Sequence, residues 1–220
     1  MGKKGLFVGM LTLDFIYLTA SFPSPNQKLA AADYTVSAGG PATNAAVTFS
    51  YLGNQALVLT VAGNHPINGL IGSDLDNYKV AIADLEPART EPPPVSSIIV
   101  TQNTGDRAVV SLNASKAQAG VNAIPADILQ GVDIVLIDGH QIEVSCAIAQ
   151  QAKAKNIPIV IDGGSWKPGL ENILPMVDYA ICSDNFYPPN CHNTEQVFSY
   201  LSNLRISHIA ITRGEKPILY

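Results

Sequence analysis

Residues 37–53 have the sequence Ser-Ala-Gly-Gly-Pro-Ala-Thr-Asn-Ala-Ala-Val-Thr-Phe-Ser-Tyr-Leu-Gly, in which a glycine pair runs directly into a helical pattern. Its apolar residues recur at spacings of three and four, which predicts an amphipathic helix with one face formed by Ala42, Ala45, Ala46, Phe49 and Leu52. Pro41 suits the first turn of this helix, because the N–H that proline lacks would have no partner there. Gly53 stands where a helix commonly ends. The stretch therefore predicts a helix that follows directly on a glycine turn.

The glycine pair before this helix, Gly39 and Gly40, follows a strand-like run over residues 34–37. Glycine has no Cβ, so a ligand can approach the backbone closely at such a turn. Asn44 lies one turn into the helix and offers both a donor and acceptors to a polyol. The alternative is an ordinary strand-to-helix turn whose small residues serve close packing.

Composition describes a globular chain and excludes several classes of protein. The 220 residues suffice for one substantial core, with 47% hydrophobic and 14% charged residues. The net charge of −5 argues against a nucleic-acid partner held through its phosphates. Three cysteines are too few for a disulfide framework, which favours a cytoplasmic location. No apolar run has the length of a membrane-spanning helix, so we expect no membrane partner.

Short apolar runs alternate with helical patterns along most of the chain. Strands are predicted over 5–10, 57–61, 133–140, 157–161, 179–182 and 208–212, and helices over 67–78, 143–155 and 194–204. This alternation is typical of parallel βαβ units, so we expect an α/β fold with a doubly wound, mainly parallel sheet and helices on both faces. Polar or glycine residues follow these strands and should collect at one edge of the sheet.

Four further strand-like segments come from two separate stretches, 15–18 with 32–37 and 97–102 with 107–112. The second pair flanks the turn Asn103-Thr104-Gly105-Asp106, which is typical of a β-hairpin. We expect them to form a small β-sheet lid from about residues 14–37 and 96–113, on one domain spanning 1–220. A surface meander is the alternative.

The pattern Gly-Gly-x-x-x-Asn-x-Ala, here Gly39 to Ala46, resembles the first signature of the ribokinase-like (pfkB) family of sugar and nucleoside kinases. The resemblance extends over nearly all 220 residues. It implies a ribokinase-like fold whose lid closes over a sugar. It also implies an ATP-dependent sugar kinase that uses ATP and Mg²⁺ to phosphorylate a small ketose or pentose.

The resemblance also implies which residues bind the two substrates. In the family an aspartate in a Gly-x-x-x-x-Asp setting, here Gly9 to Asp14, grips the sugar, since a carboxylate accepts hydrogen bonds from two hydroxyls. The implied sugar contacts are Asp14, Gly39, Gly40, Asn44 and His140. The implied nucleotide contacts are Ser183, Asp184, Thr212 and Gly214. A turn or cap role for Asp14, and a satisfied strand-end role for His140, are the alternatives.

Two departures from the family pattern shape the expected activity. Many family members carry Asn-x-x-Glu where this chain has Ser183-Asp184-Asn185-Phe186. The sequence found here is more similar to ketohexokinase-like and sulfofructose-kinase-like members than to ribokinase. The second signature, Asp-Thr-x-Gly-Ala-Gly-Asp, carries the catalytic aspartate and does not occur in these 220 residues. We expect it beyond Tyr220, so we assign no catalytic residue and no metal ligand. The chain as given is then C-terminally incomplete and inactive alone.

Two alternatives to a kinase remain open from the residues. One is a non-catalytic sugar- or nucleotide-binding member of the family, and the other is an interaction protein that works through its lid. Exposed lid strands must be paired or protected, so we also expect a homodimer through the lid.

Overall fold

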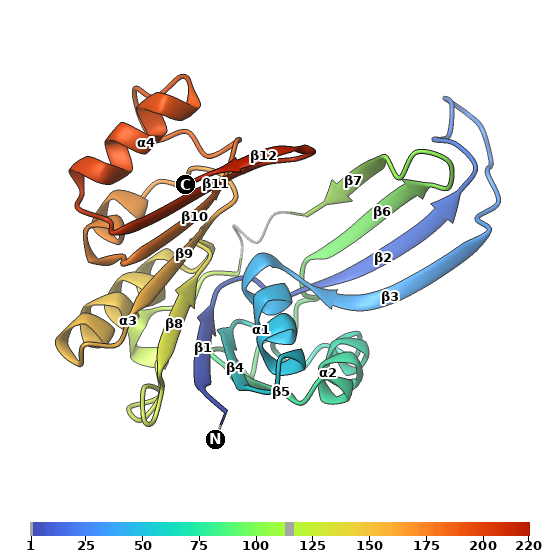
Figure 1. Cartoon of the computed structure of the whole chain (residues 1–220). Helices are drawn as coiled ribbons and strands as arrows, with labels where there is room; N and C mark the ends of the chain where they lie inside the picture. Colours follow the sequence, from blue (N-terminus) through green and yellow to red (C-terminus); the bar gives the residue numbers. More distant parts are fainter. Residues whose placement is uncertain (1, 113–116) are drawn as a thin grey trace.

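A computed structural model describes residues 2–112 and 117–220 of the chain (Figure 1). Within them, the main sheet has eight strands in the order β12-β11-β10-β9-β8-β1-β4-β5. Their bounds are β1 Lys4–Val8, β4 Gln55–Thr60, β5 Val80–Asp84, β8 Ile134–Ile137, β9 Ile159–Gly163, β10 Tyr179–Ser183, β11 His208–Arg213 and β12 Lys216–Leu219. All neighbouring strands are parallel except β11 and β12. The predicted mainly parallel sheet is therefore confirmed.

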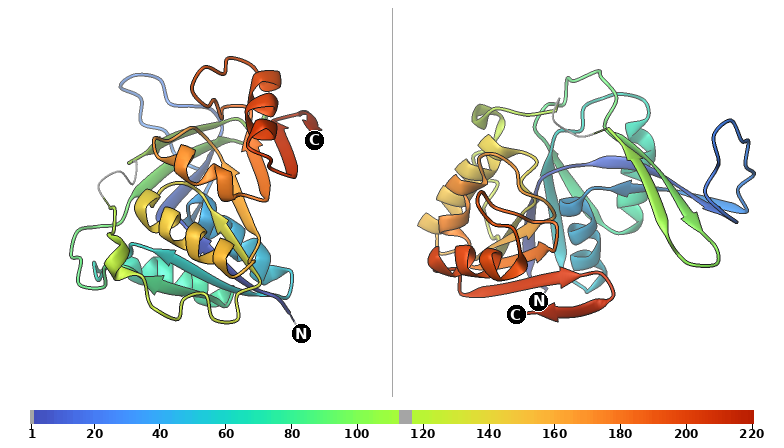
Figure 2. Two further views of the ribbon diagram at one scale, coloured as in Figure 1. Left: turned by 90° about the vertical axis from the view of Figure 1, so that its left-hand side faces the viewer. Right: turned by 90° about the horizontal axis from the view of Figure 1, so that it is seen from above.

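Helices cover both faces of this sheet (Figure 2). Their bounds are α1 Pro41–Tyr51, α2 Asn68–Asn77, α3 Ile142–Ala154 and α4 Thr194–Asn203, with short 3₁₀ turns η2 Val121–Ala123, η3 Leu170–Asn172 and η4 Leu174–Met176. In β1, Leu6 and Val8 belong to the core that includes α3 and α4, whereas Phe7 belongs to the core that includes α1 and α2. Side chains of a strand point alternately to opposite faces, so the continuous apolar run of β1 serves two cores.

Helix α1 forms where the sequence predicts it. Pro41 occupies its first turn, and its buried residues are Ala42, Thr43 and Ala46. Gly40 is the N-cap residue with φ 102°, and Gly53 follows the helix with φ 87°. Both glycines thus adopt backbone conformations that residues with a Cβ rarely adopt.

The lid is a second, four-stranded sheet in the order β3-β2-β6-β7. Its strands are β2 Thr12–Thr19, β3 Asp33–Gly39, β6 Val95–Thr101 and β7 Arg107–Ser111. The central strands β2 and β6 pair in parallel, and each has an antiparallel partner at the edge. The predicted small sheet is confirmed, and Asn113, the last residue of its predicted range, lies outside the described residues. That residues 1–220 form one domain stays a prediction.

Most strands begin or end a few residues away from their predicted bounds, and one strand was not predicted at all. β2 starts at Thr12 rather than Phe15, so Asp14 lies inside a lid strand and not in the loop after β1. β5 was not predicted, because this segment of five residues, which ends at Asp84, is too short to show a run of β-branched residues. β12 runs from Lys216 to Leu219 and pairs antiparallel with β11. No helix of residues 2–112 and 117–220 is long and apolar enough to cross a membrane.

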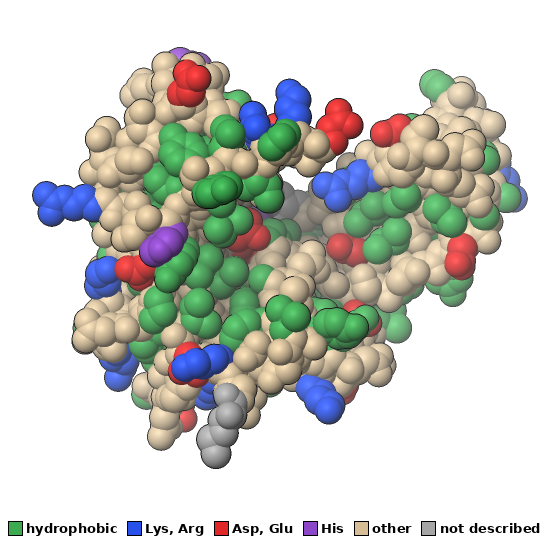
Figure 3. Space-filling view, in the orientation of Figure 1, with side chains coloured by type: hydrophobic (Ala, Val, Ile, Leu, Met, Phe, Trp, Pro, Cys, Tyr) green, Lys and Arg blue, Asp and Glu red, His purple; other side chains and the backbone are tan. Residues whose placement is uncertain are grey.

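The face of the sheet that α1 packs on is only partly covered in the described chain. In β10, Ala180 and Cys182 are at most 1% exposed, whereas the alternate residues Tyr179 and Ile181 are 37% and 43% exposed. Hydrophobic side chains gather on the visible surface beside the lid (Figure 3). The α3 and α4 side of β10 is therefore buried, and its opposite side is open.

Candidate functional site

The carboxyl ends of the parallel strands meet at one edge of the main sheet, and the lid extends from this edge (Figure 1). β1 leads into lid strand β2, β8 ends just before Asp138, and β10 ends at Ser183. Open α/β sheets bind ligands outside this edge, because the chain reverses direction there and leaves crevices between its loops. The expected collection of polar residues is thus placed where a ligand can reach it.

A cavity of about 870 Å³ lies between this edge, helix α1 and the lid. Three predicted sugar contacts, Asp14, Gly40 and Asn44, line it together. Further lining residues come from the lid and from the sheet, and include Ser96, Arg107, Ser111, Leu136, Val160 and Asp162. The space-filling view shows this hollow between the lid and the body of the molecule (Figure 3). Polar groups on an apolar floor suit a small ligand with hydroxyl groups.

Asp14 is held in one orientation by its neighbours. The Thr12 hydroxyl donates a hydrogen bond to Asp14 Oδ1 at 2.8 Å, and Thr12 itself is 1% exposed. A Cβ on Gly39 would overlap the other carboxylate oxygen of Asp14. Gly39 does not line the cavity, so its lack of a side chain makes room for Asp14 rather than for a ligand.

Gly40 and Asn44 approach the cavity from the first turn of α1. A Cβ on Gly40 would overlap the carbonyl oxygen of Met10, so the close contact of α1 with the loop after β1 requires glycine. Asn44 is exposed in the cavity wall, and its backbone carbonyl accepts the Thr48 hydroxyl at 2.9 Å. The Asn44 side chain therefore lies where it can contact a bound ligand.

His140 lies at the same sheet edge but is not among the residues that line the cavity. Burial lowers the pKa of its imidazole, and the nearby Asp138 carboxylate opposes that shift. The backbone carbonyl of His140 accepts a hydrogen bond from the Gln118 side chain at 2.6 Å. The structure thus places His140 beside the site, without showing a direct contact with the cavity.

The predicted nucleotide contacts lie at the ends of β10 and β11. Ser183 and Thr212 are directly opposite one another in the strand pairing and line a second hollow of about 210 Å³. The Asp184 N–H donates to the carbonyl of Thr212 at 2.9 Å. Asp184 and Gly214 are exposed and do not line this hollow. The structure therefore brings Ser183 and Thr212 together and leaves the other two beside them.

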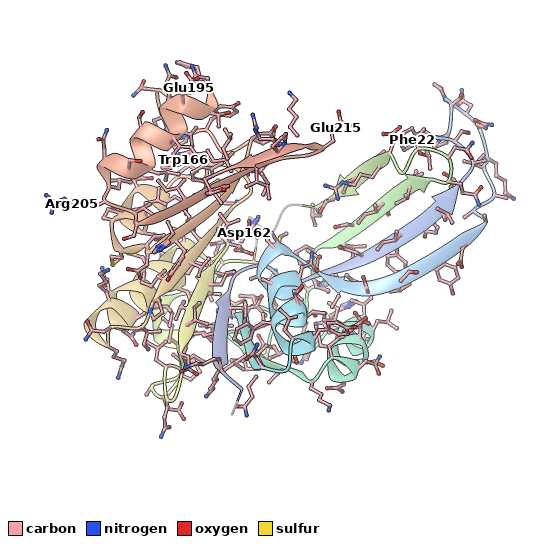
Figure 4. The ribbon with its side chains drawn as sticks, viewed as in Figure 1. Phe22, Asp162, Trp166, Glu195, Arg205 and Glu215 are labelled. Carbon is pink, nitrogen blue, oxygen red and sulfur yellow. The ribbon has the colours of Figure 1, made fainter. Side chains whose placement is uncertain are left out.

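Asp162 lines both hollows and was not predicted as a site residue. It lies at the carboxyl end of β9, on the lid side of the sheet (Figure 4). Burial first, and the Asp138 charge second, raise the pKa of Asp162, while Lys167 opposes the shift. The signal in the sequence was Asp162-Gly163-Gly164 after a buried strand, but no motif assigned that aspartate a role. Asp162 therefore connects the two hollows.

The architecture defines a ribokinase-like α/β protein with a β lid. The chain is similar in structure to a candidate ribokinase of Agrobacterium tumefaciens, with TM-score 0.83 and 23% identity over 99% of this chain and 72% of that one. It is also similar to ribokinase of Thermotoga maritima, with TM-score 0.76 and 18% identity over 100% and 74% of the two chains. For Arabidopsis thaliana ribokinase complexed with ribose and ATP, the TM-score is 0.71, with 16% identity over 99% and 74%.

The family itself is shown by a family model rather than by these distant structures. The model of the pfkB family carbohydrate kinases matches residues 3–220. The chain therefore belongs to the pfkB family of carbohydrate kinases, as its glycine-pair signature predicts.

Proposed function

We propose that this chain carries the sugar site of an ATP-dependent kinase that phosphorylates a hydroxyl of a small ketose or pentose. The observation that carries the proposal is the single cavity lined by Asp14, Gly40 and Asn44 beneath a lid. The Asp14 carboxylate accepts hydrogen bonds from sugar hydroxyls, and the Asn44 amide donates and accepts at a neighbouring hydroxyl. Family membership supports the same reaction.

The nucleotide side of the proposal rests on Ser183, Asp184, Thr212 and Gly214. These residues would approach ATP at the ends of β10 and β11, next to the hollow that Asp162 shares. Mg²⁺ prefers oxygen ligands and is usually held by one or two carboxylates together with phosphates, so Asp162 with the Ser183 and Thr212 hydroxyls fits such an ion. When bound, Mg²⁺ neutralises charge on the phosphates.

A non-catalytic sugar- or nucleotide-binding member of the family is the alternative. Such a member would keep the binding residues and lack the phosphoryl-transfer machinery. Sequencing the gene past codon 220 separates the two proposals. An Asp-Thr-x-Gly-Ala-Gly-Asp stretch there supports the kinase, and a stop codon supports the binding protein.

Calorimetric titration of the chain with ribose, fructose and related sugars tests the proposed sugar site directly. We expect one of these sugars to bind at one site per chain, without nucleotide, because the cavity is built from residues of this chain. No binding by any sugar of the panel would contradict the proposal. A ketohexokinase-like preference, indicated by Ser183-Asp184-Asn185-Phe186, predicts that fructose binds more tightly than ribose.

We also propose that the protein is a cytoplasmic homodimer that associates through its lid. Cys146, Cys182 and Cys191 are free cysteines, as is usual in a reducing compartment. β7 is an edge strand of the lid, and all five of its residues are exposed. An exposed edge strand presents unpaired backbone groups to a second copy. A monomer by light scattering at high protein concentration would contradict this arrangement.

A further inference from the structure

The Asp138 carboxylate connects three segments of the chain that are far apart in sequence. Its Oδ2 accepts the N–H of Met10 at 2.9 Å and of Ala42 at 3.2 Å, and its Oδ1 accepts the N–H of His140 at 2.8 Å. Asp138 is 1% exposed and does not line the cavity. One buried carboxylate thus holds the loop after β1, the first turn of α1 and the turn after β8.

Helix α1 depends on this external acceptor because its own N-cap has no side chain. The first N–H groups of a helix have no partner within it, and a Ser, Thr, Asp or Asn cap usually accepts one of them. Gly40 makes no side-chain cap, and a Cβ there would overlap the Met10 carbonyl. Asp138 therefore does for Ala42 what a capping side chain would do, and its negative charge suits the helix N-terminus.

The position of the carboxylate is itself fixed on two sides. The Asp138 N–H donates to the carbonyl of Val8 at 3.1 Å, which continues the pairing of β8 with β1. A Cβ on Gly9 would overlap the Asp138 carboxyl group, so the lack of a side chain at Gly9 leaves room for this carboxylate. The Met10 carbonyl in turn accepts the Thr43 hydroxyl at 3.0 Å. The loop and the helix are thereby tied to one another as well as to Asp138.

We propose that Asp138 is a positioning residue that sets the spacing of the sugar contacts without touching the sugar. Two of the segments that it holds carry a proposed contact, since Asp14 follows Met10 and Asn44 follows Ala42, and the third carries His140 beside the cavity. Without the carboxylate, these segments lose their common acceptor, while every group proposed to bind the sugar stays in the chain. The inference rests on the proposed sugar site.

Asp84 provides a matched control elsewhere on the same sheet. At the end of β5 its carboxylate also accepts three backbone N–H groups, from Ala62 at 3.0 Å, Gly63 at 2.8 Å and Glu86 at 3.0 Å. None of these residues lines the cavity. Asp84→Asn therefore removes the same kind of interaction as Asp138→Asn but leaves the proposed sugar contacts alone.

The test is calorimetric titration of wild type, Asp138→Asn and Asp84→Asn with the sugar that wild type binds. For Asp138→Asn we expect the sugar Kd to rise about tenfold or more, which corresponds to about 1.4 kcal/mol, with stoichiometry unchanged. For Asp84→Asn we expect an unchanged Kd, even where the melting temperature falls as much. A purely structural role would instead lower the stoichiometry of Asp138→Asn at an unchanged Kd, and that result would overturn the proposal.

Two further measurements separate this inference from the proposed function. Gly9→Ala pushes a methyl group against the carboxylate while keeping its charge, and we expect it to raise the sugar Kd as Asp138→Asn does. Amide hydrogen exchange at Met10, Ala42 and His140 needs no sugar, and we expect it to be faster in Asp138→Asn than in Asp84→Asn. Equal exchange overturns the positioning role, whereas a wild type that binds no sugar overturns the proposed function.

Discussion

The proposed sugar side and the proposed nucleotide side of the candidate site differ in how strongly hydrogen bonds and burial fix their side chains. On the sugar side, Thr12 and Thr43 are at most 1% exposed, and their hydroxyls donate hydrogen bonds of 2.8 and 3.0 Å. On the nucleotide side, Asn185 is exposed, and its backbone and side chain reach the Ser183 hydroxyl at 3.1 and 3.4 Å. The Thr212 hydroxyl reaches the Cys182 carbonyl at 3.4 Å. Buried, short hydrogen bonds fix side chains, and exposed, long ones do not.

From this difference we expect the proposed sugar site to be organised before a ligand arrives and the proposed nucleotide site to become ordered only on binding. Groups that are already fixed lose less conformational entropy on binding, so fewer favourable contacts are needed for a sugar to bind at the proposed sugar side. The nucleotide side also adjoins the open face of β10, where Tyr179 and Ile181 are exposed. We therefore expect the chain to bind sugar without binding ATP tightly.

The largest expected effect is on turnover: residues 1–220 should show no sugar-dependent release of ADP. An alcohol needs a base in the transition state, worth about 10²–10⁴-fold, and preorganised donors on the phosphoryl group are worth about 10²–10³-fold each. We find no sequence signature for either among the 220 residues. A coupled ADP assay with ribose, fructose and related sugars measures this, with a complete ribokinase as positive control. Turnover at ordinary rates of about 1–10³ s⁻¹ would show that a carboxylate of this chain, such as Asp162, serves as the base.

Asp14→Ala should weaken sugar binding strongly while leaving the fold intact. Loss of a hydrogen bond to a charged group costs about 1.5–3 kcal/mol, or about 10- to 100-fold in Kd. Asp33→Ala is the control, because Asp33 is an exposed lid aspartate outside the cavity lining, and its carboxylate accepts the N–H of the next residue at 2.8 Å. Titration calorimetry of both variants gives the comparison. Equal affinities would remove Asp14 from the sugar site.

The glycines at the two ends of α1 separate backbone strain from steric overlap. Gly40→Ala combines φ 102° with an overlap against Met10, whereas Gly53→Ala has φ 87° and nothing within 4 Å of the added Cβ. We expect Gly40→Ala to lower the free energy of unfolding by about 3 kcal/mol and Gly53→Ala by about 1 kcal/mol. Urea denaturation measures both. If both variants lost the same free energy of unfolding, the loop after β1 would be able to move away from the added methyl group. That result would contradict a rigid arrangement of the loop and α1.

The smallest expected effect is on the pH dependence of stability. Because burial raises the pKa of folded Asp162 above its ordinary value of 3.8, the free energy of unfolding should fall as the pH rises through the raised pKa. Asp162→Asn cannot ionise, so its stability relative to wild type should increase from acid to neutral pH. Asp133 is the opposite case, because the Lys4 N–H and then Lys3 lower its pKa. Asp133→Asn should lose stability relative to wild type over the same range, as urea denaturation at several pH values would show. If the stability of both variants relative to wild type changed in the same direction with pH, the burial of Asp162 would not explain the change in Asp162→Asn.

Sequence patterns predicted the parts of the fold that local chemistry determines. The spacing of small residues after Gly40-Pro41 fixed α1, and apolar runs located most strands of the sheet, because period and composition are local properties. β5 was not predicted, because its five residues form a strand through their pairing with β4 and not through a local sequence pattern. Asp14 was expected just after the first strand, at the start of the lid, and the pairing of β2 with β3 and β6 places it inside a lid strand.

The site was predictable only where a motif or a strand end marked it. Asp14, Gly40 and Asn44 line one cavity, and their contact with a sugar stays a prediction. The contact of Gly39 with Asp14 and the three hydrogen bonds of Asp138 arise between segments distant in sequence, so no spacing rule reveals them. Asp162 followed a predicted strand, but its role depends on which face of β9 it occupies.

The parallel pairing of β2 with β6 has a consequence for the order in which the protein folds. The register runs from Leu13 opposite Val95 to Thr19 opposite Thr101, so every contact joins residues about eighty positions apart. Closing so long a loop costs chain entropy before any contact compensates, and such pairings form slowly. The intervening segment contains α1, β4, α2 and β5, which bring the two lid strands together once they have packed. We therefore expect the lid to assemble last, on a core that has already folded.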